Sequence, residues 1–199
     1  MPIKDNREYR NFALTEFRAK EEDEGYIVEG YAALFNAPYV LFTDEEGREY
    51  NEDISADAFK SADMSDIVFL YNHEGMVYAR LRNNTLEVTP DEKGLHVRAD
   101  LGSTKASKEV FEAIKAGLID QMSWAFTIDA DKYDKKTRTR TITSVRKVYD
   151  VSAVSIPANP ATSISARSYF NGVIEAEKAE RLEREHKQKL LELKLKLEA

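Results

Sequence analysis

Three residues of this sequence carry the side chains that nucleophilic catalysis by a serine requires: Ser123, His73 and Asp150. A nucleophilic serine needs a base within hydrogen-bond reach, and a carboxylate orients an imidazole base and stabilises the imidazolium that forms. Triads are defined by geometry and not by chain order, so the spacing alone does not show that the three residues meet. A Ser-His-Asp hydrolase is one hypothesis, and a β-rich binding or assembly domain is the alternative that the residues alone favour.

The composition limits other kinds of chemistry. No cysteine is present, which excludes disulfides, thiolate metal sites and cysteine nucleophiles. The few histidines (His73, His96 and His186) exclude a His-rich metal site, and we expect no metal and no cofactor. A net charge of -7 argues against nucleic-acid binding. Because no apolar run has the length of a membrane span and no signal peptide begins the sequence, we expect a soluble intracellular protein without membrane or nucleic-acid partners.

A strand-like segment, 118–128, positions Ser123. Side chains alternate between the two faces of a strand, so Met122 and Trp124 share an apolar face and Ser123 lies on the opposite face. We expect Met122 and Trp124 to be buried and Ser123 to point toward a cleft. The same pattern is also typical of an ordinary half-buried strand.

Asp150 lies in a second strand-like segment, 148–156, and alternation places it on the same face as Ser152. A carboxylate on the inward face of a strand is unfavourable unless it is paired. Its partner is either the histidine of a catalytic site or a nearby cation, Arg146 or Lys147.

The remaining pattern predicts a β-rich α+β domain. A continuous apolar run, 67–71, has the length of a buried strand and ends at His73, which is either a base or part of a polar turn. A helix is expected over 103–116, where apolar residues recur at helical spacing, and Gly117 ends it. Further strands are predicted at 8–20, 26–35, 81–88, 95–101 and 137–145, with a loop at 36–51.

The composition changes near the C-terminus. Glu, Lys, Arg and Leu dominate there, and leucines recur at spacings of three and four. The pattern predicts a folded domain at 1–168 and a charged amphipathic helix at 169–199. This helix is either a solvated helix or an arm that pairs with a partner or with a second copy of the chain.

Several segments, in this order, resemble the prohead maturation protease family of tailed bacteriophages, which are relatives of the herpesvirus assemblin proteases. They are Ile27–Asn36, Glu52–Phe59, Phe69–Glu74, Met122–Phe126 and Asp150–Pro160. The resemblance covers roughly residues 8–168. It implies a herpesvirus-protease-like barrel of mostly antiparallel strands with a few packed helices.

The resemblance also implies a function: a serine endopeptidase inside the immature phage capsid, the prohead, in the host cytoplasm. Its partners would be the major capsid protein and the scaffolding segment of that protein, and self-cleavage within 163–172 is a further expectation. His73 matches the family's base and Ser123 its nucleophile. Asp150 falls where the family has an acidic residue, more often glutamate, and His96 is the other candidate because the herpesvirus relatives use a second histidine. A non-catalytic capsid assembly or scaffolding factor on the same fold is the alternative function.

Overall fold

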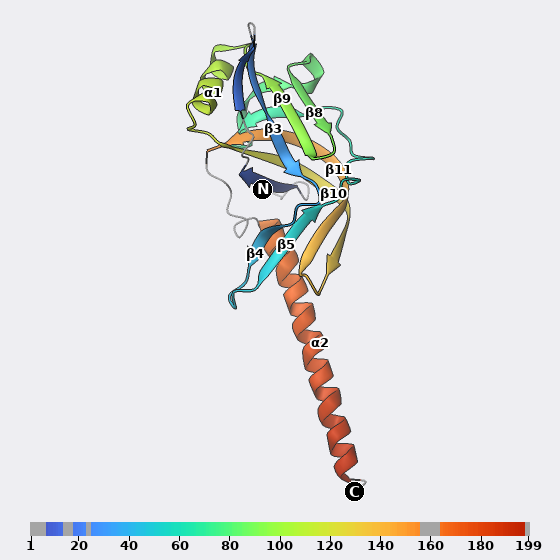
Figure 1. Cartoon of the computed structure of the whole chain (residues 1–199). Helices are drawn as coiled ribbons and strands as arrows, with labels where there is room; N and C mark the ends of the chain where they lie inside the picture. Colours follow the sequence, from blue (N-terminus) through green and yellow to red (C-terminus); the bar gives the residue numbers. More distant parts are fainter. Residues whose placement is uncertain (1–6, 14–17, 23–24, 156–163, 198–199) are drawn as a thin grey trace.

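The computed structural model describes residues 7–13, 18–22, 25–155 and 164–197 of the chain. Its strands form two sheets, accompanied by helices α1 and α2 and a short 3-10 helix, Leu81–Asn83 (Figure 1). The larger sheet contains β1 (Glu8–Ala13), β10 (Gln121–Asp134), β11 (Thr139–Val154), β5 (Glu49–Ile54) and β4 (Tyr39–Thr43) in that order, with β6 (Val68–Tyr71) on β11 and β7 (Glu74–Arg80) on β6. The smaller sheet contains β2 (Arg18–Glu22), β3 (Gly25–Leu34), β9 (Gly94–Asp100) and β8 (Leu86–Pro90) in that order.

The fold is β-rich α+β, as the sequence predicts. Most neighbouring strands run antiparallel, whereas β11 pairs in parallel with β5 and with β6. Among the described strands neither sheet closes on itself, so the expected closed barrel is wrong.

The hairpin of β10 and β11 is the centre of the larger sheet. The sequence predicts two separate strands along β11, but the structure has one long strand, because bulges in the pairing with β10 bend the hairpin without ending it. The first part of β11 pairs with β5, and its last part, from Asp150 to Ala153, pairs with β6. Three strands therefore meet where Asp150 lies.

Local sequence signals set the helix α1 (Lys105–Lys115). The side chain of Thr104 caps its start by accepting a hydrogen bond from the backbone N–H of Ser107, and Gly117 follows its end with a φ of 71°. The apolar face carries Phe111, which is buried in the main core. The same core contains Trp124, whose ring stacks on Phe126.

The segment 36–51, expected to be a loop, contains β4 and the first half of β5. The reason is a tertiary contact: Leu41 and Tyr50 are buried in a second apolar cluster together with Phe170 of α2 (Ile164–Leu197). Of the features that argue against strands in the sequence, the acidic run and Gly47 lie in the connection between β4 and β5, and Pro38 directly precedes β4.

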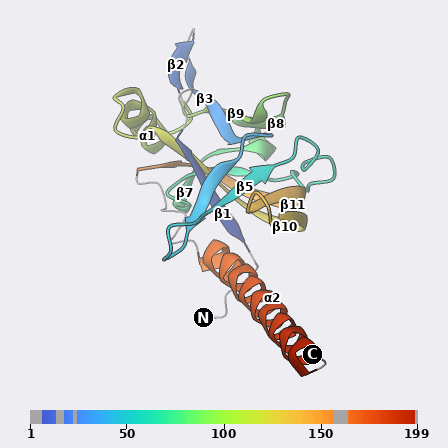
Figure 2. The same cartoon turned by 60° about the horizontal axis from the view of Figure 1, so that its bottom comes forward.

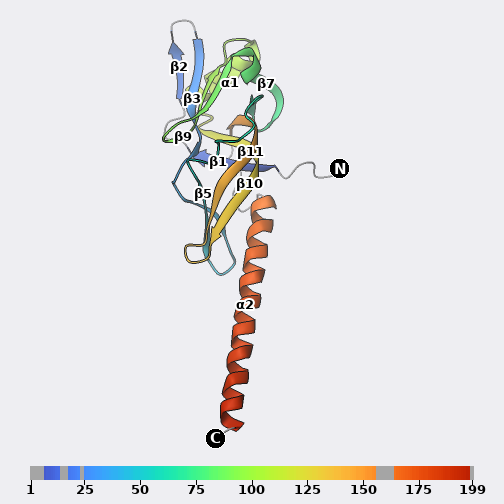
Figure 3. The ribbon, with the colours of Figure 1, turned by 90° about the vertical axis from the view of Figure 1, so that its right-hand side faces the viewer.

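Helix α2 packs on the sheets only near its start. Phe170 is fully buried, Lys135 bonds Glu180 at 2.7 Å, and every described side chain from 181 to 194 is exposed. The helix extends away from the sheets in each view (Figure 2 and Figure 3). None of the helices in the described ranges combines the length and the apolarity that crossing a membrane requires.

Candidate active site

Ser123, His73 and Asp150 meet at one place on the larger sheet. The Nε2 atom of His73 lies 2.6 Å from Oγ of Ser123, and its Nδ1 atom lies 2.6 Å from Oδ1 of Asp150. Both distances are those of strong hydrogen bonds. When Nδ1–H donates to the carboxylate, Nε2 is left as the acceptor for the hydroxyl proton, which is the arrangement that activates a serine for acyl transfer.

Strand register explains the approach of the serine and the acid. On β10 and β11, Ser123 pairs with Ser152, and Ala125 pairs with Asp150. Ser123 and Asp150 therefore lie two positions apart on neighbouring strands, which is a diagonal that side chains on one face can span.

The histidine reaches them from a tight hairpin. Tyr71 of β6 pairs with Glu74 of β7, so Asn72 and His73 form a two-residue turn. Their φ angles are 52° and 61°, the left-handed values that a type I′ turn requires at both positions. The backbone N–H of Asn72 donates to the carbonyl of Ala153 on β11 at 3.0 Å, which fixes the turn beside the end of β11.

A fourth side chain, the hydroxyl of Ser152, completes the polar contacts. It donates to Oδ1 of Asp150 at 2.9 Å and lies 3.2 Å from Nδ1 of His73. Ser152 was not among the residues predicted to form the site, although the strand face that it shares with Asp150 is a signal for it in the sequence.

The N-terminal strand β1 contributes a further contact. The carbonyl oxygen of Arg10 lies 3.0 Å from Oγ of Ser123, so the single hydroxyl proton has two acceptors in reach. The ring of Tyr9 packs edge-on against His73, with centroids 4.8 Å apart. No sequence signal predicts these contacts, because they depend on the pairing of β1 with β10, more than a hundred residues away.

The burial of the nucleophile strand agrees only in part with expectation. Met122 and Trp124 are fully buried, as predicted. Ser123 is also fully buried, so the cleft expected on its face is not open in this structure, and the prediction of an open face is wrong. His73 keeps 17% of its side chain exposed and is the accessible member of the group.

The alternative partners lie elsewhere. His96 belongs to β9 of the smaller sheet and pairs with Glu29 at 3.2 Å. Arg146 pairs with Asp129 and Lys147 with Asp63, so neither cation binds Asp150. Within the part of the chain that the structure describes, no group of three or more acidic or histidine side chains is arranged to hold a metal ion.

Comparisons with known proteins agree with the geometry. The sequence model of the caudovirus prohead serine protease family matches residues 14–174. The prohead protease of Enterobacteria phage HK97 is 27% identical over 168 residues, which span 82% of this chain and 69% of that protein. No solved structure matches the chain significantly.

Proposed function

This chain belongs to the family of caudovirus prohead serine proteases, hydrolases of peptide bonds, and we propose that Ser123, His73 and Asp150 perform its reaction. The observation that carries the proposal is the unbroken line of hydrogen bonds from Ser123 Oγ through both nitrogens of His73 to Asp150. Serine hydrolases on unrelated folds share this arrangement, and each link in it has a chemical role.

The proposed mechanism is acyl transfer. His73 Nε2 takes the hydroxyl proton while Oγ of Ser123 attacks the carbonyl carbon of the scissile bond and forms a new C–O bond. The imidazolium then gives this proton to the leaving nitrogen as the C–N bond breaks, and water hydrolyses the acyl-enzyme by the same path in reverse. Asp150 stays ionised and holds the imidazole with Nδ1–H directed toward it. Ser152 supports Asp150 through its own hydrogen bond.

The burial of Ser123 adds a step before the chemistry. Because Ser123 has no exposed surface, a substrate carbonyl reaches Oγ only when a neighbouring segment moves aside. Tyr9 is exposed and His73 is partly exposed beside the site, so we propose that substrate approaches from their side.

We propose that the substrate is the major capsid protein with its scaffolding segment, cleaved within the prohead in the host cytoplasm. The HK97 relative and the family are both named for proteolysis in the prohead, which supports that part of the proposal. Self-cleavage is part of the proposal, with 163–172 as the candidate segment. Residue 163 lies outside the described residues, and Phe170 is buried, so cleavage near Phe170 requires the start of α2 to leave the sheets.

The division into a protease domain at 1–168 and an arm at 169–199 is also a proposal. The exposed helix beyond residue 181 supports an arm that pairs with capsid or scaffold protein, or with a second copy of the chain. We propose that the chain is similar to the herpesvirus assemblin proteases in carrying its catalytic groups on strands. The proposal does not include a closed barrel.

Co-expression with the capsid protein tests the catalytic proposal. Ser123→Ala should abolish cleavage, with a loss of roughly 10⁴-fold to 10⁶-fold in kcat, because the nucleophile is removed. Ser144→Ala, a serine on β11 opposite Ala130 and outside the site, is the matched control and should cleave normally. Wild-type cleavage by a folded Ser123→Ala variant would show that Ser123 is not the nucleophile. A wild-type chain that neither cleaves nor reacts at Ser123 would favour the non-catalytic assembly factor.

A further inference from the structure

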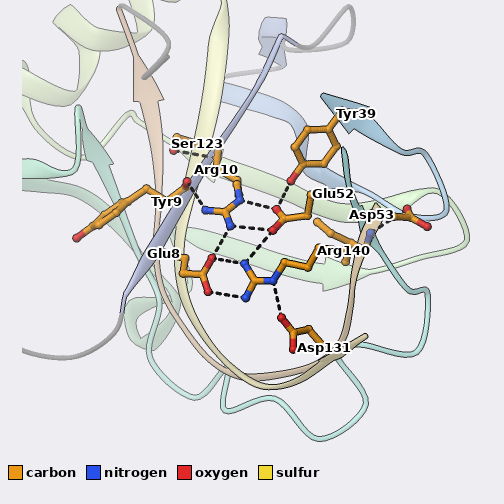
Figure 4. Close-up of polar contacts among 10 residues, drawn as sticks. Glu8, Tyr9, Arg10, Tyr39, Glu52, Asp53, Ser123, Asp131 and Arg140 are labelled. Atoms are coloured by element: carbon orange, nitrogen blue, oxygen red, sulfur yellow. Dashed lines mark hydrogen bonds and ion pairs between the residues drawn. The ribbon is translucent and has the colours of Figure 1, made fainter. Parts of the chain in front are cut away.

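A network of buried charged side chains lies beside the nucleophile strand (Figure 4). Its members, here called the buried ion network, are Glu8, Arg10, Glu52 and Arg140, exposed by 7%, 2%, 0% and 3%. Arg10 binds both carboxylates, and Arg140 bonds Glu8 at 2.9 and 3.0 Å and Glu52 at 3.2 Å. Two cations and two anions from β1, β5 and β11 therefore neutralise one another inside the protein.

The remaining polar atoms of the network also have partners. The hydroxyl of Tyr39 donates to Glu52, and Nε of Arg140 donates to Asp131, each at 2.5 Å. Burial raises the pKa of Glu8, but the charges and hydrogen bonds of Arg10 and Arg140 outweigh burial and hold that pKa below its usual value. Buried charges persist only when they are paired and hydrogen-bonded, so each member has little freedom to move.

The network is connected to the nucleophile through one residue. The side chain of Arg10 belongs to the network, and its own carbonyl oxygen lies 3.0 Å from Oγ of Ser123. Arg10 Nη1 also donates to the carbonyl of Tyr9 at 2.9 Å, which ties the side chain back to its own strand. Strand β1 is an edge strand that pairs only with β10 among the described strands, so side-chain contacts are needed to fix its position from the far side.

We propose that Arg10 is a positioning residue for Ser123. This rests on the proposed function of Ser123. The buried ion network fixes β1, and β1 places the Arg10 carbonyl where it sets the rotation of the Ser123 hydroxyl toward Nε2 of His73. A small displacement of β1 therefore moves Oγ of Ser123 relative to Nε2 of His73 and weakens the transfer of its proton to the base. Misplacement of a reacting group by about 1 Å can slow a reaction about a hundredfold.

The test measures the nucleophile directly with a fluorophosphonate probe, which reacts with an activated serine and needs no knowledge of the natural substrate. Arg10→Lys keeps the charge but loses the forked contact with Glu52, and Glu52→Gln keeps the shape but loses the charge. We expect both variants to label Ser123 about tenfold to a hundredfold more slowly than wild type across the neutral pH range. Leu95→Ala, in the core strand β9 of the other sheet, is the control for lost stability and should label at nearly the wild-type rate at temperatures where it is folded.

The outcomes separate the two proposals. Absence of labelling at Ser123 in the wild type, judged against Ser123→Ala, would overturn the proposed function. Wild-type labelling rates in folded Arg10→Lys and Glu52→Gln, with lowered unfolding temperatures, would show that the network is merely structural and would overturn the positioning role. If Arg10→Lys does not fold, Glu52→Gln decides the result, because an amide retains hydrogen bonds to Tyr39 and Arg10.

Discussion

Ser123 and Ser152 are register partners on β10 and β11, and their hydroxyls lie at opposite nitrogens of the same imidazole. Ser123 Oγ is 2.6 Å from Nε2 of His73, and Ser152 Oγ is 3.2 Å from Nδ1. In the proposed mechanism the first serine reacts, and the second holds the acid that orients the base. One strand pair thus supplies both the nucleophile and the support of the base.

Removal of the second hydroxyl should slow the reaction without unfolding the protein. Ser152→Ala takes one donor from Asp150, and a hydrogen bond to a charged group contributes about 1.5 kcal/mol, which corresponds to roughly tenfold in kcat. Cleavage of a fluorogenic peptide with circular dichroism as the folding check measures this effect. Thr127→Val is the matched control, because Thr127 is buried on the same strand as Ser123 and its hydroxyl has no hydrogen-bond partner among the residues that the structure describes. Equal kcat in Ser152→Ala and wild type would contradict the role of Ser152.

The role of Asp150 can be tested by replacing it with asparagine, which has the same shape. Asp150→Asn offers Nδ2–H to Nδ1 of His73, which favours the tautomer with its proton on Nε2, and that nitrogen then cannot accept the proton of Ser123. We expect kcat to fall about 10⁴-fold, as in other serine triads. Ser152 Oγ lies at the same carboxylate oxygen as Nδ1 of His73, so it would accept the second N–H of the amide, and the unfolding temperature should change little. Full activity of the folded variant would point to a Ser-His dyad.

The buried ion network predicts a loss of stability in acid. Because the folded state lowers the pKa of Glu8 below its usual value of 4.5, this carboxylate stabilises the fold above that pH, and the contribution is lost as pH falls through the lower folded value. Glu8→Gln should lower the free energy of unfolding at neutral pH by about 3 kcal/mol. Its unfolding temperature should also depend less on pH in the acid range. The control is Glu45→Gln at an exposed position, which should follow the wild-type curve. An unchanged acid dependence in Glu8→Gln would mean that other groups account for it.

Helix α2 should divide into a structural start and a free remainder. Phe170→Ala removes a fully buried ring and should lower the free energy of unfolding by about 3 kcal/mol. Truncation after Arg181 removes only exposed side chains among the described residues, so stability and peptide cleavage should stay near wild type. Incorporation into proheads, measured by co-purification, should fall in the truncated chain. Normal incorporation of the truncated chain would exclude the arm proposal.

The sequence predicts helices and strands correctly where local patterns are strong. The prediction fails where contacts with residues far along the chain determine the structure. The stop at Gly117 and the burial of Trp124 follow from spacing and turn chemistry. The carbonyl of Arg10 could not be predicted, because a backbone atom has no residue type and its position depends on a strand pairing across the whole chain. The strands in 36–51 were missed because Phe170, far along the chain, completes their apolar cluster.

The candidate site was predicted from residue chemistry together with the family resemblance. Neither source revealed the left-handed backbone of His73, because histidine is an uncommon residue at a position where Asn-Gly turns are preferred. The sequence pattern places Ser152 and Asp150 on one face, but alternation alone does not distinguish a supporting hydroxyl from a buried neighbour.

The two-residue turn that carries His73 has a consequence for how the chain can change in length. Surface loops usually tolerate insertions. At Asn72-His73 one additional residue would replace the turn type, shift the register of β6 against β7, and rotate the imidazole away from Ser123. The connection between β4 and β5 at 44–48 carries no residue of the candidate active site. Related chains should therefore vary in length at 44–48 and keep a fixed length at 72–73.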